Sequence, residues 1–577
     1  MARLARQVSD TSIWKSLQNP TFRRLWVASL VSGCCVSAQD TAATWIMNTL
    51  TQSSFLISAM STVAALPFFF FTLPAGAMAD MIDRRRLLIW MNVWLAFTAA
   101  LLTGLQLVHL LDPYLILGIV FLIGTGFAFY APAWSSLVPE IVTKEELPSA
   151  VTLGGVQLNI SSILGPALGG LLVPLMGAPA VFAANSVCFL LVVSVLFVWR
   201  PSFAPQKLPL ENFLESFASA VRYVRYAPGM QVVLARDVLF SVFISVIPAL
   251  LPVVGLRVLH LDSTHLGMLF TTMGIGSVGC AVLVIPRARA RFSSNNLTML
   301  ANALLAAVFF LMVWVRNVDL FLGVAVLAGI SWTLAASELW VAAQRAMPSW
   351  ARGRMNATHM MVSQGGMALG GLVWGGLAAS VNVQFALLAA ALLLLFSLSL
   401  SVPLSIDFAQ RLDLDPAPLT TARHRRLQVP EPQEGPVSVT MEFEVEEENR
   451  ARFLELMREM RLVYLRNGAF SWRLDEDLEK RNRFRMEMLV TSWSEHLQQH
   501  ERMTRGELDT WEKLWALHSG QKGPVVKHYL SVNKELLPRR LLQRPPPRTK
   551  GTKNQPPGVG PSKTAPPVAA PDVSQIP

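Results

Sequence analysis

A few charged and polar residues stand inside long apolar stretches of this 577-residue sequence, and Asp40 is the most prominent of them. It lies beside Gln39 and Thr41 within the apolar stretch 25–50. Because a charge inside a membrane is costly, such a carboxyl usually faces a cavity, where it can take up and release a proton. We predict that Asp40 couples proton movement to the movement of a cationic or polar substrate. The alternative is a structural acid paired with a hydroxyl group or an arginine.

Other polar residues inside apolar stretches are weaker candidates for the same cavity. Glu338 either lines it or pairs with Arg345 or Arg352 at an inner gate. Gln157 and Asn159 either line it or form hydrogen bonds between helices.

Two aromatic residues and one basic-acidic pair complete the candidates. Trp45 and Tyr130 have polar or proline-containing neighbours, so we predict that they contact substrate, although most aromatic residues here are expected in the interface belt or in packing. Arg236 and Asp237 are adjacent and are expected to satisfy each other or the membrane interface. His359, near the start of another apolar stretch, is expected at the interface too.

The elements that position these residues are membrane-spanning helices. Hydrophobic residues make up 52% of the chain, charged residues only 15%, and the mean hydropathy is +0.42, whereas soluble domains carry about 25% charged residues. Backbone groups cannot face lipid unpaired, so long apolar runs are helices. Twelve runs have spanning length of about 20 residues: 25–50, 55–79, 87–110, 114–137, 149–175, 178–199, 233–256, 264–285, 297–315, 319–343, 357–380 and 382–404.

The basic residues fix the expected orientation. With the N-terminus (1–24) in the cytoplasm, nearly all loop arginines and lysines fall inside, and only Arg257 and Arg316 fall outside, in accord with the positive-inside rule. Both termini are then cytoplasmic. The longest break, 200–232, contains an expected amphipathic helix on the inner membrane surface, with Val221 among its apolar residues. It separates helices 1–6 (25–199) from helices 7–12 (233–404), the arrangement of a transporter built from repeats.

Two motifs follow the pattern of a known superfamily. The loop Gly76-Ala77-Met78-Ala79-Asp80-Met81-Ile82-Asp83-Arg84-Arg85-Arg86 resembles the signature loop of the major facilitator superfamily, although Met81 and Asp83 replace the usual arginine and glycine. The resemblance implies a cytoplasmic gate formed by Gly76, Asp80, Asp83, Arg84 and Arg85, with the latch weakened or formed through Arg84 and Arg85.

The second motif, Gly165-Pro166-Ala167-Leu168-Gly169-Gly170, resembles the Gly-Pro motif of exporter branches of that superfamily. A proline removes a backbone hydrogen bond and small residues permit close packing, so a pivot is expected here. With Asn19-Pro20-Thr21-Phe22-Arg23-Arg24 and Leu73-Pro74-Ala75-Gly76, the chain resembles the transmembrane secretion effector branch, which includes the enterobactin exporter and relatives of macrolide efflux proteins.

A separate small domain is expected after a linker at 405–436. Residues 437–445 alternate as a strand, 447–466 form an amphipathic helix, and strands at 469–474 and 484–493, a helix at 494–518 and a strand at 524–532 follow. The order suits a ferredoxin-like fold over 437–533. It resembles the antibiotic-biosynthesis-monooxygenase-like domain appended to this branch, which implies a cytoplasmic dimerising or sensing module. The tail 534–577 is basic, Pro-rich and expected to be disordered.

No catalytic set, metal site or cofactor is predicted. His496 and His500 are spaced to share a helix face and bind a metal, but a solvated face among charged neighbours is favoured because no third ligand is evident. Trp472 and Trp493 do not complete an acid-base set. The four cysteines, Cys34, Cys35, Cys188 and Cys280, are interpreted as small packing residues.

These observations predict a secondary transporter of the cell inner membrane with an all-α, twelve-helix fold. No Walker loop is present, so a proton gradient is the expected energy source. The expected activity is proton-coupled export, by alternating access, of a bulky small molecule such as a siderophore or macrolide. Its expected partners are that substrate, protons, the bilayer and a second copy, not nucleic acid. The alternatives are a metabolite importer or facilitator of the same fold and a membrane-tethered oxidoreductase acting through the C-terminal domain.

Overall fold

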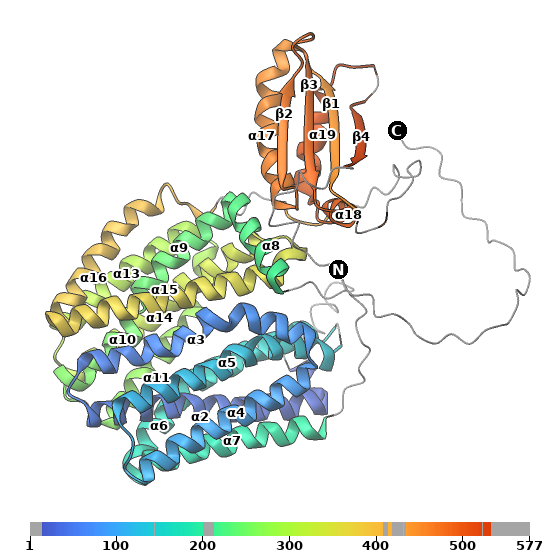
Figure 1. The fold of residues 1–577 in the computed structure, drawn as a ribbon. Coiled ribbons are helices and arrows are strands. Elements are labelled where there is room, and N and C mark those ends of the chain that lie inside the picture. The colour runs from blue at the N-terminus through green and yellow to red at the C-terminus, as the bar shows by residue number, and fades with distance from the viewer. Residues whose placement is uncertain are drawn as a thin grey trace, which may run out of the picture.

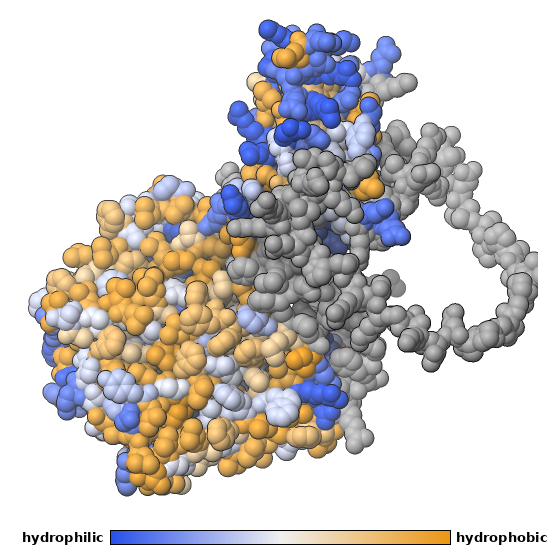
Figure 2. Space-filling view, in the orientation of Figure 1, coloured by the Kyte–Doolittle hydropathy of each residue, from blue (hydrophilic) through white to orange (hydrophobic). Residues whose placement is uncertain are grey.

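The computed structural model describes residues 14–143, 145–199, 213–407, 413–417, 431, 434–521 and 523–531. A bundle of long helices carries a small sheet-containing domain at one end (Figure 1). Apolar residues dominate the visible face of the bundle and polar residues dominate that of the small domain (Figure 2). The division matches a body embedded in lipid and a domain in water.

The first six long helices form the N half. Four of them begin at a side-chain cap. The Asn19 side chain, for example, accepts hydrogen bonds from the backbone amides of Thr21 and Phe22, and Asp112 caps a helix whose first residue is a proline. The helices are α2 (Pro20–Leu50), α3 (Ser54–Met81), α4 (Arg84–Leu107), α5 (Pro113–Ile141), α6 (Leu147–Met176) and α7 (Ala178–Val198), preceded by the short η1 (Lys15–Gln18).

The second group of helices forms the C half. Two of its spans contain a short π-helical segment, which ends the first of them and divides the second. The elements are α9 (Pro228–Ile244), α10 (Val246–Val253) and η2 (Val254–Val258); α11 (Ser263–Gly279), η3 (Cys280–Val284) and α12 (Ile285–Arg289); α13 (Ser294–Trp314); α14 (Val318–Arg345); η4 (Ser349–Ala351); α15 (Arg352–Ser380); and α16 (Val383–Ser397) with η5 (Leu398–Ser401).

Ten of these spans are long and apolar enough to cross a membrane by length and composition alone. The other two, α2 and α15, are 31 and 29 residues long and pack among the ten, α2 against α6 and α15 against α3. They are more polar because they carry residues such as Asp40 and His359 inside the bundle. The predicted twelve-helix, two-half fold is confirmed.

The predicted amphipathic helix between the halves is α8 (Phe213–Tyr226). Its buried residues, Ala220 and Tyr223, contact protein, whereas Val221 is 52% exposed. Burial raises the pKa of Tyr223 to about 12. The neutral hydroxyl donates a hydrogen bond to the carbonyl of Ala346, 3.0 Å away. Tyr223 therefore faces the protein, and Val221 lies on an exposed side of the helix.

The C-terminal domain has the predicted ferredoxin-like topology. Its antiparallel sheet has the order β2-β3-β1-β4, and α17 and α19 contribute Phe453 and Leu514 to the core beneath β1. The elements are β1 (Val437–Glu444), η8 (Glu447–Asn449), α17 (Arg450–Arg466), β2 (Ser471–Glu476), β3 (Arg483–Val490), α18 (Trp493–Glu501), α19 (Arg505–Ala516) and β4 (Val525–Leu530).

One predicted helix of this domain was wrong. The stretch 494–518 is two helices, because Thr504 begins a new one through a capping box with Glu507. The predicted tail 534–577, most of the linker 405–436, residues 1–13 and residues 200–212 lie outside the described residues.

The C-terminal domain is attached to the C half. The Trp350 indole nitrogen donates to the carbonyl of Arg502 at 3.1 Å, and the Arg502 guanidinium lies 5.0 Å from the centre of the Trp350 ring. The Arg466 guanidinium lies 5.4 Å from the ring of Tyr223 on α8. Stacked cations of this kind contribute about 0.5–2 kcal/mol each. The domain is therefore held by α8 and by the loop between α14 and α15.

Candidate functional site

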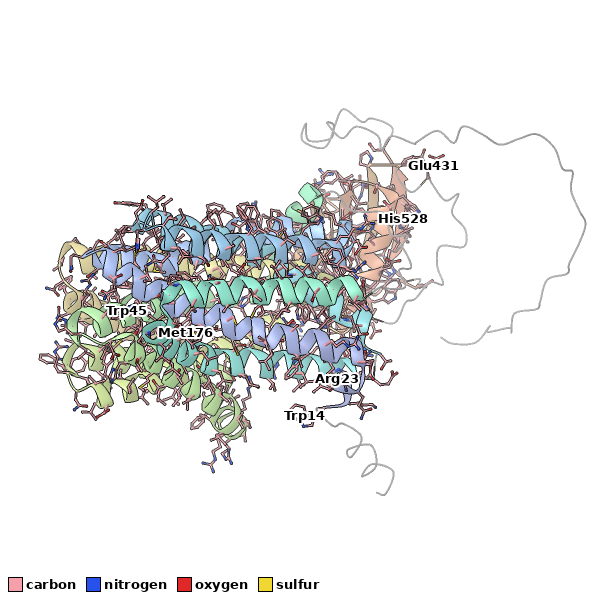
Figure 3. The ribbon with its side chains drawn as sticks, turned by 90° about the horizontal axis from the view of Figure 1, so that it is seen from below. Trp14, Arg23, Trp45, Met176, Glu431 and His528 are labelled. Atoms are coloured by element: carbon pink, nitrogen blue, oxygen red, sulfur yellow. The ribbon has the colours of Figure 1, made fainter. Side chains whose placement is uncertain are left out.

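The bundle has two ends that Figure 3 distinguishes. Arg23 and the C-terminal domain lie towards one, which we call the Arg23 end. The opposite end is called the Met176 end, because Met176 is the last residue of α6.

The two halves are in close contact near the Met176 end. A Cβ added to Gly170 on α6 would lie 2.8 Å from the Cα of Gly267 on α11, and one added to Gly371 on α15 would lie 2.3 Å from Oγ1 of Thr62 on α3. The separation at Gly170 is to backbone and permits only glycine, as is usual where membrane helices cross closely. These two crossings form the seam between the halves.

Arg257 crosses this seam. It follows α10 in the C half, and its guanidinium donates to Oε1 of Gln52 at 2.5 Å, to the carbonyl of Asn48 at 3.3 Å and to the carbonyl of Thr51. All three acceptors lie in or just after α2 in the N half. Nothing in the sequence marked Arg257 as functional, except that it was one of the few basic residues expected outside.

The Arg23 end is different. A Cβ added to Gly76, Gly154 or Gly155 would meet no heavy atom within 4 Å in the described part of the chain. In this conformation, therefore, no neighbouring helix packs closely against Gly76 among the described residues. The halves are closed together at the Met176 end, and these glycines are uncrowded at the other.

Asp40 occupies the inner face of α2. Positions 29, 33 and 40 share one side of this helix by their spacing. Ser29 lies beside Tyr130 of α5, and a Cβ on Gly33 would lie 2.6 Å from Oγ of Ser161 on α6. Asp40 is nevertheless exposed, and its carboxylate forms no hydrogen bond or ion pair with any described residue. An unpaired carboxylate on the interior face is suited to binding a proton or a cation.

The remaining predicted cavity residues lie on three helices. Tyr130 is half-buried and stacks on Trp134, with ring centres 5.9 Å apart. Trp45 on α2 is half-buried and packs against the apolar cores of both halves. Gln157 and Asn159 on α6 are half-buried, and their side-chain amides form no hydrogen bond with described residues. Their amides are therefore free for a ligand.

Glu338 is not exposed to a cavity. Its side chain is fully buried, and Oε1 accepts a hydrogen bond from Nε of Arg289 at 2.7 Å. The expected partners, Arg345 and Arg352, are not the ones used. Because α12 and α14 both belong to the C half, the pair stabilises that half internally.

A buried ionisable cluster lies between α9 and α15. Arg236, Asp237 and His359 are 2%, 3% and 6% exposed. Nδ1 of His359 lies 3.5 Å from Oδ2 of Asp237, whereas Nη1 and Nη2 of Arg236 have no hydrogen-bond partner among the described residues. Adjacent helical residues point in different directions, so the expected Arg236–Asp237 pair does not form. A buried charge with so few partners is costly. The cluster is therefore a stronger candidate for a functional role than the sequence alone indicated.

The residues of the signature loop bind within the N half. Asp83 caps α4 by accepting hydrogen bonds from the backbone amides of Arg85 and Arg86, which explains its presence where glycine is usual. Arg84 pairs with Glu140 at the end of α5. The Arg85 guanidinium donates to carbonyls at the end of α7, 2.7 and 2.9 Å away. The side chain of Asp80 lies outside the described residues.

The Gly-Pro motif places α6 between two neighbours. A Cβ on Gly165 would lie 2.4 Å from Cβ of Ser37, and one on Gly169 would lie 2.6 Å from the carbonyl of Ala38, both on α2. Pro166 lies inside the helix, and Gly170 meets the other half. The motif thus packs α2 against α6 at the seam.

In the C-terminal domain, His496 and His500 have different environments. His496 is buried, so the interpretation of a solvated face was wrong for it, and its Nε2 lies 3.0 Å from Nε2 of His528 on β4. His500 is exposed. No group of three or more potential metal ligands occurs within the described ranges. Separately, the sulfur atoms of Cys35 and Cys188 lie 3.2 Å apart between α2 and α7.

Two six-helix halves that meet along glycine seams define a transporter of the major facilitator type. The solved nucleoside transporter NupG has the same fold, with a TM-score of 0.55 and 12% identity over 66% of this chain and 99% of that one. A bacterial homologue of the human lysosomal transporter Spinster, in an inward-facing and occupied conformation, has a TM-score of 0.51 and 13% identity over 70% and 98% of the two chains.

Within that class, the chain belongs to the transmembrane secretion effector family, whose profile matches residues 11–536. The enterobactin exporter EntS of Citrobacter koseri is 25% identical over 63% of this chain and 86% of its own length. Macrolide efflux protein A of Streptococcus pyogenes is 22% identical over 43% of this chain. That alignment spans 62% of the efflux protein's length.

Proposed function

We propose that this protein is a proton-coupled exporter that moves a bulky small molecule across the cell inner membrane by alternating access. One observation carries the proposal. Asp40 is exposed and unpaired within the described structure, on the inner face of α2, while the halves are closed together at the Met176 end. The similarity to exporters of a siderophore and of macrolides supports the direction and the substrate class.

The proposed orientation has both termini in the cytoplasm, so that the Arg23 end is the inner end. The basic loop residues support it through the positive-inside rule, and the C-terminal domain lies towards the same end as Arg23 (Figure 3). The conformation described would then be inward-facing. Gln157, Asn159, Trp45 and Tyr130 would line the substrate path, and the residues of the signature loop would form the inner gate.

The test uses the full chain in proteoliposomes loaded with a fluorescent macrolide or a ferric siderophore. An imposed pH gradient should drive transport, and its collapse by an ionophore should stop net movement. Asp40→Asn should abolish gradient-driven transport while exchange of substrate down its own gradient persists. Transport that ignores the pH gradient, or full activity in Asp40→Asn, would contradict proton coupling.

The other candidate activities give different results. An importer would raise the intracellular substrate concentration in intact cells, and an exporter would lower it. An oxidoreductase would consume oxygen with substrate even when Asp40 is replaced. We propose self-association through the C-terminal domain as its role, because ferredoxin-like domains of this type often pair through their sheets. Sedimentation of the full chain with and without residues 437–577 tests this.

A further inference from the structure

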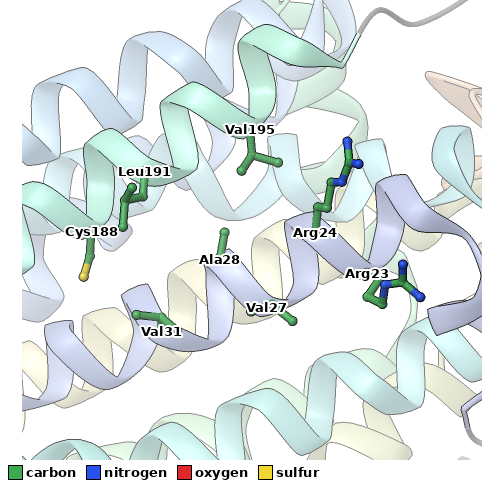
Figure 4. A pocket seen from close by; sticks show the side chains of 8 residues that line it. All are labelled: Arg23, Arg24, Val27, Ala28, Val31, Cys188, Leu191 and Val195. Carbon is green, nitrogen blue, oxygen red and sulfur yellow. The ribbon is translucent and has the colours of Figure 1, made fainter.

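A groove runs along the outer surface of the N half between α2 and α7, with a volume of about 450 Å³ (Figure 4). Val27 and Val31 from α2 and Leu191 from α7 line it, and they are 47%, 44% and 52% exposed. On a membrane-spanning helix, exposed side chains this apolar are expected to face lipid tails. The groove is therefore separate from the inner face of α2, which carries Asp40.

Two arginines close one end of this apolar groove. Arg23 and Arg24 belong to the first turns of α2, one turn before Val27. Both are exposed, and neither side chain forms an ion pair or hydrogen bond with the described residues. These two arginines, adjacent in the sequence and both lining the groove, carry a charge of +2 and present donors suited to phosphate oxygens. The groove thus offers anion recognition at one end and an apolar channel along the rest.

We propose that this groove binds an anionic phospholipid of the cytoplasmic leaflet, with the headgroup phosphate on Arg23 and Arg24 and an acyl chain along Val27, Val31 and Leu191. The leaflet assignment rests on the proposed orientation. Charge selects this occupant over a zwitterionic lipid, because each basic residue near an anionic membrane surface contributes attraction. Spacing supports it too, since positions 23, 27 and 31 form one continuous stripe on α2.

The site matters because α2 carries Asp40. A lipid wedged between α2 and α7 would fix the position of α2 relative to the rest of the N half. Lipid composition would then influence transport without entering the substrate path.

Binding is measured on the purified full chain in detergent, by native mass spectrometry after titration with phosphatidylglycerol or phosphatidylcholine. We expect a tightly retained phosphatidylglycerol, and Arg23→Gln with Arg24→Gln should weaken it by about tenfold. The matched control, Arg287→Gln with Arg291→Gln, removes the same charge from the same end of the bundle in the C half and should change little. Equal retention of both lipids, or equal weakening by the control pair, would overturn the proposal.

A second variant keeps the charges and fills the groove. Val31→Trp should displace the acyl chain and reduce retention of phosphatidylglycerol, and a monodisperse gel-filtration profile would show that the variant is folded. Retention unchanged in Val31→Trp would mean that the arginines bind only a headgroup, which contradicts the groove. Because these measurements need neither transport nor orientation, failure here leaves the exporter proposal intact. Conversely, loss of proton coupling would not affect lipid retention.

Discussion

Replacing Arg257 with alanine should favour conformations that are open at the Met176 end. The guanidinium donates to Gln52 and to the carbonyls of Asn48 and Thr51 across the seam, and these bonds exist only while the halves are closed there. A hydrogen bond to a charged group contributes about 1.5–3 kcal/mol. Because Arg257 is only half-buried, we take about 2 kcal/mol for the whole set. At 1.4 kcal/mol per factor of ten, the equilibrium would shift by about 30-fold.

The assay measures the distance between spin labels placed at Leu110 and Leu320, which are exposed residues in the N and C halves near the Met176 end. Arg257→Ala should enlarge the population at long distances. Arg316→Ala is the matched control, because Arg316 is the other basic residue expected on this side and has no polar contact with the described residues. An unchanged distance distribution in Arg257→Ala, or the same change in Arg316→Ala, would refute the role of these bonds as a gate.

Three further outcomes are expected. Asp237→Asn removes the buried carboxylate that approaches His359 and should lower the free energy of unfolding in detergent by about 3 kcal/mol; an unchanged melting curve would show that the cluster is hydrated. Oxidative cross-linking of Cys35 to Cys188 should proceed readily at their 3.2 Å separation and leave transport intact, since both belong to one half; lost transport would mean that α2 and α7 move apart. The pKa of Glu487 is held below its usual range because an arginine of β2 donates to its carboxylate. The stability that this ionised carboxylate supplies is present above its unfolded pKa of about 4.3 and is lost as the pH falls through its lower pKa in the folded protein. Glu487→Gln should therefore flatten the acid-unfolding curve followed by fluorescence. An unaltered curve would contradict this contribution.

The spans and the topology of the small domain could be predicted because they depend on local patterns. A long apolar run indicates a membrane helix, and alternation of apolar and polar residues indicates a strand. Both can therefore be predicted without knowing which elements pack against them. The break at Thr504 was missed because apolar spacing continued across it, although the capping box Thr504–Glu507 was readable in the sequence. The role of Tyr223 could not be predicted, because its hydrogen-bond acceptor, the carbonyl of Ala346, lies far away in the sequence.

Pairing could not be predicted, because partners come from helices far apart in the sequence. Glu338 pairs with Arg289 rather than with Arg345, which is nearer in the sequence. Asp237 approaches His359 rather than its sequence neighbour Arg236. A sequence shows that a buried charge needs a partner, but helix packing decides which one it reaches. The contacts of the seam could not be predicted either. Glycine is common in membrane helices, and only the fold shows which glycines lie where two helices cross.

The distribution of these contacts explains how the halves can move as units. The ion pairs Arg84–Glu140 and Arg289–Glu338 each join helices of one half, and the C-terminal domain is tied through Trp350 to the C half. The carboxylate of Glu338 is fully buried, so breaking its pair with Arg289 is expensive, and the C half resists internal rearrangement. The seam instead depends on glycine contacts and on the hydrogen bonds of the half-buried Arg257, for which water can substitute. A rocking motion would therefore separate the halves at the seam before it disturbed either interior, and the C-terminal domain would travel with the C half.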